Sequence, residues 1–134
     1  MEENLEKNSG LVEKAAYVQN PIKPEITFEQ FEKIDVRLCR ILSVEKVEKS
    51  DKLYKMIINT GIDERIVVSS IAKVLQKEEL IGNLFPFVLN LPPRKIFGID
   101  STAMILLAEN QDELHQMTII GQDDPFAKQG AIVI

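Results

Sequence analysis

This chain of 134 residues has a single cysteine, no tryptophan and no long apolar run. Because Cys39 has no second cysteine to pair with, an internal disulfide framework is excluded, and one cysteine cannot by itself make a zinc site. No segment approaches the ~20 apolar residues that a membrane span requires, and the N-terminal residues lack the pattern of a signal peptide. We therefore expect a cytoplasmic protein without a membrane segment or a bound metal.

Signatures of catalysis are also missing. The sequence contains no phosphate-binding P-loop and no glycine-rich dinucleotide turn. The only histidine, His115, lies in an acidic stretch without a cysteine nearby, which is typical of a surface residue and not of a base or a ligand. Most carboxylates stand beside lysines, as they do on solvated surfaces. We predict that this chain has no catalytic site of its own and needs no cofactor.

The charge balance is acidic, with a formal net charge of −5. Such a balance disfavours binding to a phosphate backbone unless the basic residues are concentrated on one face. One segment, residues 33–55, has a local excess of basic residues. It contains Lys33, Arg37, Arg40, Lys46, Lys49, Lys52 and Lys55 against Asp35, Glu45, Glu48 and Asp51. A positive face on an acidic protein is therefore one interpretation, and mixed charges on solvated strands are the other.

The chain is long enough for one domain, and its 45% of hydrophobic residues suffice for a single core. Residues 1–24 are rich in Glu, Lys and Asn and end in Pro21-Ile22-Lys23-Pro24, which favours an extended backbone. We interpret residues 1–24 as a flexible arm or linker and residues 25–134 as the folded domain.

The apolar periodicity predicts one short helix followed by strands. Thr27 and Gln30 form the sequence signature of a capping box, so a helix is expected over 28–34. Alternation then places Val36, Leu38, Leu42 and Val44 on one face of a first strand, and Cys39 and Ile41 on the other. Further strands are expected at 53–60, 65–70, 84–91 and 102–108, helical turns at 71–75 and 77–81, an exposed basic loop at 92–100, and short strands near 117–120 and 131–134.

Five strands with a helical connection between the third and the fourth is the order of an OB-fold barrel. The predicted class is therefore all-β: a five-stranded OB-fold barrel with a short N-terminal helix and a C-terminal extension with short strands. Pro86 falls inside the fourth strand and cannot donate a ladder hydrogen bond, so it must lie at an edge, a bulge or a gap of the barrel.

Six short motifs follow one another between Glu25 and Ile134. They are Asp35-Val36-Arg37, Ser50-Asp51-Lys52-Leu53, Ile66-Val67-Val68-Ser69-Ser70-Ile71, Glu78-Glu79-Leu80-Ile81-Gly82, Asn90-Leu91-Pro92-Pro93-Arg94-Lys95 with Gly98-Ile99, and Ser101-Thr102-Ala103-Met104. In this order they resemble the tRNA-binding domain shared by the C-terminal end of many methionyl-tRNA synthetases and by stand-alone tRNA-binding dimers. The chain departs from the family at Ser70 and Ala103, where glycine is usual, and the added carbon atoms would narrow an RNA groove.

The resemblance implies an RNA site on the matching positions. Folded RNA hides its base edges in a deep major groove, so proteins contact its phosphates, 2′-hydroxyls and exposed loop bases. Lys52, Arg94 and Lys95 would bind phosphates. Asn90 and Ser101 would hydrogen-bond sugars or bases, and Met104 would lie against a base. Each has a structural alternative: the two loop cations as solubilising residues, the asparagine as a turn cap, and the methionine as core.

Aromatic residues bear on the mode of binding. Proteins that bind single strands stack successive bases on aromatic rings, and this chain has only two tyrosines and six phenylalanines. Phe28, Phe31, Phe85 and Phe87 are more simply core residues, which leaves Tyr54 and Phe97 as candidate stacking platforms. Recognition of the shape of a folded RNA is therefore expected.

For assembly, the resemblance implies a homodimer built from the helix near 27–34 and the extension after Ala108. The extension is apolar enough for this role, with Ile119, Ile120, Phe126, Ile132, Val133 and Ile134. The implied function is a non-catalytic tRNA-binding and dimerisation module that strengthens tRNA capture by a methionyl-tRNA synthetase catalytic region, in cis or in trans. The alternative is a chaperone of the CsaA kind, which has the same barrel and would bind unfolded polypeptide. Salt weakens phosphate binding but not apolar binding, so it distinguishes the two.

Overall fold

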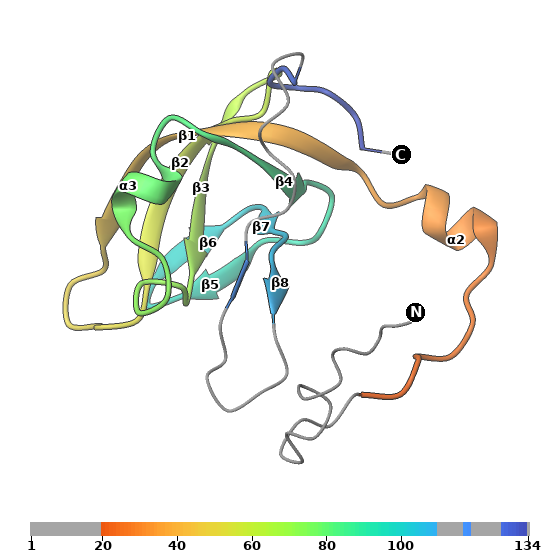
Figure 1. Cartoon of the computed structure of the whole chain (residues 1–134), viewed down its shortest axis with the longest axis horizontal. Coiled ribbons are helices and arrows are strands. Elements are labelled where there is room, and N and C mark those ends of the chain that lie inside the picture. Colours follow the sequence, from red (N-terminus) through yellow and green to blue (C-terminus); the bar gives the residue numbers. More distant parts are fainter. Residues whose placement is uncertain (1–19, 110–116, 119–126, 134) are drawn as a thin grey trace, which may run out of the picture.

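The computed structural model describes residues 20–109, 117–118 and 127–133. A curled antiparallel sheet forms the body of the protein, and a short helix projects from one end of it (Figure 1). Most of the predicted arm, the histidine at 115 and the apolar residues 119, 120, 126 and 134 lie outside the described residues. No helix in the described ranges is long and apolar enough to cross a membrane.

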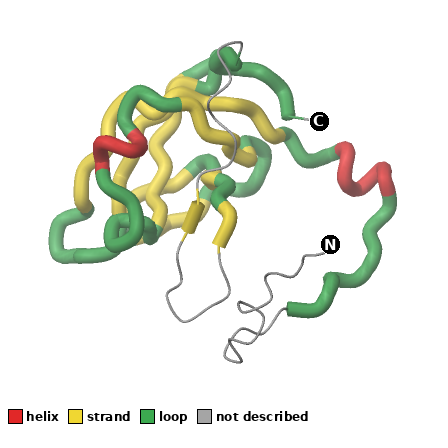
Figure 2. The backbone as a smooth tube through the Cα atoms, viewed as in Figure 1, coloured by secondary structure: helices red, strands yellow, loops and turns green. Residues whose placement is uncertain are grey.

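The strand order confirms the predicted fold class. Five strands pair in the order β3-β2-β1-β4-β7, and two further two-stranded sheets pair β5 with β6 and β8 with β9. The elements are α2 (Phe28–Glu32), β1 (Val36–Lys46), β2 (Tyr54–Asn59), β3 (Glu64–Ser69), α3 (Lys77–Leu80), β4 (Leu84–Val88), β5 (Arg94–Ile96), β6 (Ile99–Ser101), β7 (Met104–Ile105), β8 (Ala108–Glu109) and β9 (Met117–Thr118). Figure 2 shows the strands curling into an OB-like barrel with α3 at one end.

The first strand is long because it belongs to two pairings. Residues 36–40 pair with β4 and residues 40–46 pair with β2, and a bulge lies within the second pairing, between Ile41 and Ser43. A bulge inserts one residue and reverses the alternation of side chains beyond it. Cys39 and Ile41 are therefore buried before the bulge and Val44 after it, whereas Leu42 is 41% exposed. Simple alternation, which put Leu42 and Val44 on one face, was wrong at this point.

Two sets of irregular backbone hydrogen bonds complete the barrel. Beside the first half of β1, Leu38 N donates to Ala131 O at 2.9 Å and Val133 N donates to Val36 O at 2.8 Å, so the C-terminal segment covers this edge. Beside β3, Thr102 N donates to Ile66 O at 3.0 Å. This second contact joins β3 to the residue that follows the hairpin β5–β6.

Pro86 explains why the predicted strand 102–108 is interrupted. Leu106 N donates to Pro86 O at 2.9 Å, but proline has no N–H with which to return the second bond of the pair. The ladder between β4 and β7 therefore ends at Ile105, and the chain pairs again only at β8. Pro86 lies at a gap in the ladder, and a gap was one of the three places predicted for it.

The predicted loop 92–100 contains a β-hairpin instead. Arg94 pairs with Ser101, Lys95 with Asp100 and Ile96 with Ile99, so only Phe97 and Gly98 remain to make the turn. Asn-Gly and Asp-Gly are the usual sequence signals for such a turn, and a phenylalanine before the glycine hides it.

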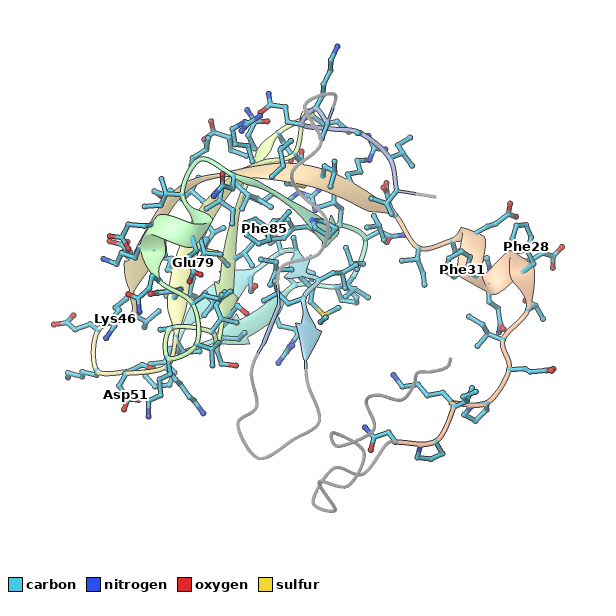
Figure 3. The ribbon with its side chains drawn as sticks, viewed as in Figure 1. Phe28, Phe31, Lys46, Asp51, Glu79 and Phe85 are labelled. Atoms are coloured by element: carbon cyan, nitrogen blue, oxygen red, sulfur yellow. The ribbon has the colours of Figure 1, made fainter. Side chains whose placement is uncertain are left out.

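Of the four phenylalanines that were predicted to lie in the core, only two are buried. Phe85 and Phe87 are fully buried in the core, as predicted, and Figure 3 shows Phe85 inside the barrel. Phe28 and Phe31 are 71% and 54% exposed on α2, so assigning them to the core was wrong. The capping box of α2 is present, with Gln30 N donating to Thr27 Oγ1 at 3.0 Å and Thr27 N donating to Gln30 Oε1 at 2.8 Å.

Candidate nucleic-acid interface

A groove of about 400 Å³ lies between β3, the loop 47–53 and the hairpin β5–β6. In OB folds the second and third strands and the loops at their ends form the usual ligand-binding face. The predicted residues Lys52, Arg94, Ser101 and Met104 all line this groove. Ser70 and Ala103, the two positions where the family usually has glycine, line it as well. The groove is therefore the place where four of the six predicted site residues meet.

The hairpin separates its two basic residues onto opposite faces. Side chains alternate along a strand, so Arg94 and Ile96, which line the groove, share one face of β5 and Lys95 lies on the other. Lys95 Nζ is 3.0 Å from Asp100 Oδ1, its partner across the hairpin. Arg94 is exposed and has no such ion pair with any residue in the described ranges. The groove therefore receives the charge of Arg94, while much of the charge of Lys95 is balanced locally.

Ser101 has a structural role in the barrel. Its side chain is buried, and its Oγ accepts a hydrogen bond from Val68 N at 3.0 Å. The same hydroxyl lies 3.4 Å from Ala103 O, to which it donates. Ser101 therefore holds the end of the hairpin against β3, at one wall of the groove.

Asn90 and Met104 connect the groove to α2. Asp35 N donates to Asn90 Oδ1 at 2.8 Å, and Asn90 Nδ2 donates to Lys33 O at 2.5 Å. A second, more apolar groove of about 350 Å³ is lined by Lys33, Ile34, Val88, Asn90, Leu91 and Met104. Asn90 is therefore in contact with the segment that follows α2, and Met104 lines both grooves.

Lysines surround a third hollow beyond the loop 47–53. It has a volume of about 710 Å³ and is lined by Lys46, Lys49, Ser50, Asp51, Lys52 and Phe97. The carboxylate of Asp51 is 3.2 Å from Lys73 Nζ, and this hydrogen-bonded ion pair lowers the pKa of Asp51. Lys52 and Phe97 line both this hollow and the main groove, so the two form one continuous basic face.

Tyr54 and the single cysteine, Cys39, are both buried and cannot contact a ligand directly. Tyr54, the second possible stacking platform, is 3% exposed, and its hydroxyl donates to Leu75 O at 2.9 Å. Cys39 is fully buried, and this burial raises the pKa of its thiol to about 11. The thiol is therefore protonated and unreactive at neutral pH.

Sequence reasoning missed Arg65. From the start of β3, its Nη1 donates to Leu89 O at 2.7 Å and to Thr102 O at 3.1 Å. These two carbonyls stand at the two ends of the segment that carries the hairpin. Asp63 Oδ1, 3.2 Å from Arg65 Nε, orients the guanidinium. A lone arginine at the start of a β-branched strand gives no sequence signal for this role, because both acceptors are backbone atoms far away in the chain.

Comparison with known proteins agrees with this geometry. Residues 36–129 match the family model described as "Putative tRNA binding domain". A methionine--tRNA ligase of Porphyromonas gingivalis is 49% identical over 100 residues, which cover 75% of this chain and 15% of that ligase. The chain therefore spans only a small part of the length of this relative.

Two solved structures are similar in fold. A MetRS related protein from Pyrococcus horikoshii has a TM-score of 0.76 and 32% identity, and the match covers 84% of this chain and all of that one. The CsaA chaperone protein from Picrophilus torridus has a TM-score of 0.71 and 26% identity, with 82% of this chain and all of that one covered. The family match, the ligase relative and the OB-like barrel agree, and this chain belongs to the tRNA-binding domain family.

Proposed function

We propose that this domain binds folded tRNA on the basic face formed by the main groove and the loop 47–53, without catalysing a reaction. The observation that carries the proposal is the position of Arg94, exposed and unpaired within the described residues, over a groove on the usual ligand face of the fold. Lys52 contributes a second cation, and Lys95 adds charge from the back of the hairpin. Met104 offers an apolar surface at the edge of the groove, while Asn90 and Ser101 position the segments that carry these residues.

The biological role follows from the relatives. Because this chain corresponds to a small part of a methionine--tRNA ligase, we propose that it acts in the cytoplasm as an auxiliary module that strengthens tRNA capture by a synthetase catalytic region, joined to it in cis or bound to it in trans. A homodimer would present two basic faces to one RNA and raise the apparent affinity through effective concentration.

The test is fluorescence anisotropy of labelled, folded tRNA titrated with single variants at two salt concentrations. Arg94→Ala is expected to weaken binding about 10-fold or more, because it removes a charge-assisted hydrogen-bond donor from the groove. Lys95→Ala should cost less, since Asp100 already balances that charge. Lys128→Ala is the matched control: this exposed lysine lies beside the turn at the other end of β2.

Wild-type binding that weakens steeply with salt and depends on Arg94 supports the proposal. Equal losses for Arg94→Ala and Lys128→Ala would indicate a nonspecific charge effect and place the site elsewhere.

The second candidate function is protein binding of the chaperone type, favoured by the apolar groove beside Ile34, Val88 and Met104 and by the similarity to CsaA. Apolar binding of an unfolded polypeptide should persist at high salt, where phosphate binding is lost. If the wild-type chain ignores tRNA at low salt but binds a reduced, unfolded polypeptide at high salt, the chaperone function replaces the RNA function.

A further inference from the structure

The tip of the hairpin exposes an aromatic ring on a backbone that phenylalanine rarely adopts. Phe97 has φ 51° and Gly98 φ 78°, so both turn residues have positive φ, as in a type I′ turn. Asn, Asp and Gly are favoured in such turns, and a bulky residue with positive φ is an outlier. Burial does not compensate for this, because Phe97 is 61% exposed.

The other non-glycine residue with positive φ in the described ranges lines the same hollow. Lys49 has φ 68° and lies in the tight turn closed by the bond from Ser50 N to Val47 O, at 3.1 Å. Strained backbone of this kind is concentrated at ligand sites. Here the two strained positions carry a cation and an aromatic ring on one hollow of about 710 Å³. That combination suits a ligand with one anionic part and one flat part.

The charges of the hollow favour an anion. Lys46, Lys49 and Lys52 line it, and no ion pair joins any of them to a carboxylate within the described part of the chain. The one carboxylate in its lining, that of Asp51, is paired with Lys73. In Figure 3, Lys46 and Asp51 lie at the outer end of the barrel, next to the loop that joins β1 to β2.

We propose that this hollow binds one unpaired nucleotide of the RNA, with its base stacked on Phe97 and its phosphate bound by Lys49 and the neighbouring lysines. This inference rests on the tRNA binding proposed above. Unpaired bases in loops and at ends expose a π-face, and stacking on an aromatic ring tolerates any base. The domain would then distinguish RNA with an unpaired loop or end from a fully paired duplex, although it reads no sequence.

The key variant is Phe97→Asn, because it is expected to keep or raise the stability of the fold while it weakens RNA binding. Asparagine before Gly98 is the preferred type I′ pair, so the thermal midpoint should stay the same or rise. Loss of the ring should weaken tRNA binding about 5- to 150-fold. The slope of log affinity against log salt should not change, because no charge is removed.

Three further variants separate the effect of the aromatic ring at position 97 from the effect of the charge at position 49. Phe97→Leu keeps an apolar side chain and the same backbone strain but has no aromatic ring, so it should bind as weakly as Phe97→Asn. Phe97→Trp keeps a stacking surface and should bind like the wild type. Lys49→Gly removes strain and one cation, and should weaken binding while reducing the salt slope by about 1.

The probes are a folded tRNA transcript, an RNA hairpin with an unpaired loop, and a blunt-ended RNA duplex of the same length. The expected result is a preference of the wild type for the hairpin over the duplex that Phe97→Leu abolishes. If Phe97→Leu and Phe97→Asn bind tRNA like the wild type while Arg94→Ala still binds weakly, the nucleotide site is refuted and the tRNA-binding function stands. If the wild type binds no RNA, both proposals fail.

Discussion

At the residue scale, two polar side chains that were predicted to contact RNA form hydrogen bonds with the backbone of this chain instead. Asn90 binds backbone groups of Lys33 and Asp35, and Ser101 binds backbone groups of Val68 and Ala103. Ser101 is buried, and buried polar groups are usually satisfied in this way, whereas Asn90 makes its bonds at the surface. The RNA contacts are therefore expected mainly from exposed cations and one aromatic ring, with these amide and hydroxyl groups fixing the geometry beneath them.

Arg65 gives the clearest prediction at this scale. Arg65→Met keeps the apolar stem of the side chain but leaves Leu89 O and Thr102 O without their donor, so a loss of about 2 kcal/mol in the free energy of unfolding is expected. Because these carbonyls flank the hairpin segment, tRNA affinity should fall as well. Urea denaturation and the anisotropy titration measure the two effects.

Arg40→Met is the matched control for this prediction. Arg40 Nη1 makes one bond, to Gly82 O at 2.7 Å, and does not line the main groove. This variant should lose stability without losing tRNA affinity. A similar loss of affinity in both variants would mean that general destabilisation, not the position of the hairpin, explains the effect.

At the scale of elements, α2 stands out because its own contacts do not explain how such a short helix is stabilised. It has five residues and buries none of them, and helices this short are not stable alone in water. Figure 1 shows it projecting from the barrel, and Figure 3 shows Phe28 and Phe31 on it, away from the body of the protein. Two exposed phenylalanines on a helix in this position are consistent with the proposed homodimer, in which the partner would cover them.

Replacing both rings in Phe28→Ser/Phe31→Ser is expected to convert a dimer into a monomer, because the interface loses its apolar contacts. Size-exclusion chromatography with light scattering measures the mass, and the tRNA titration should show weaker binding by the monomer. Ile62→Ser, at an equally exposed apolar residue in the β2–β3 turn, is the control and should remain dimeric. A monomeric wild type would contradict the role of α2.

At the scale of the whole molecule, the C-terminal segment returns to β1, the first strand of the sheet. The segment 130–133 covers the first half of this strand, and its Gly130 packs on Gly61 of the β2–β3 turn. A Cβ on Gly61 would lie 2.8 Å from Gly130 Cα, closer than real contacts allow. The C-terminal segment is therefore part of the barrel wall.

Gly61→Ala should consequently destabilise the protein by about 2–4 kcal/mol, since it combines strain at φ 92° with a clash against the backbone of the C-terminal segment. Gly82→Ala is the matched control, because Gly82 has φ 82° and open space around its missing Cβ. It should lose only the strain, about 1–2 kcal/mol. Equal losses in urea denaturation would show that the contact between the turn and the C-terminal segment does not matter.

The sequence by itself determined the fold class, the N-terminal cap and the family. The strand-forming residues of β2 and β3, the capping box at Thr27 and Gln30, and the order of six short motifs depend on residues close together in the chain. These local patterns can be recognised in the sequence, because strand periodicity and helix capping act over a few residues. The missing N–H of Pro86 also indicated an edge, a bulge or a gap at this position, and the structure decided for a gap in the ladder.

Only the tertiary structure decided which side chains are free to bind. The bulge in β1 put Val44 on the buried face and left Leu42 exposed. The hairpin β5–β6 directed Arg94 toward the groove and Lys95 away from it. The clamp by Arg65 joins atoms 24 and 37 residues apart in the chain. Such contacts depend on how distant strands close the barrel, and local sequence patterns carry no information about that closure.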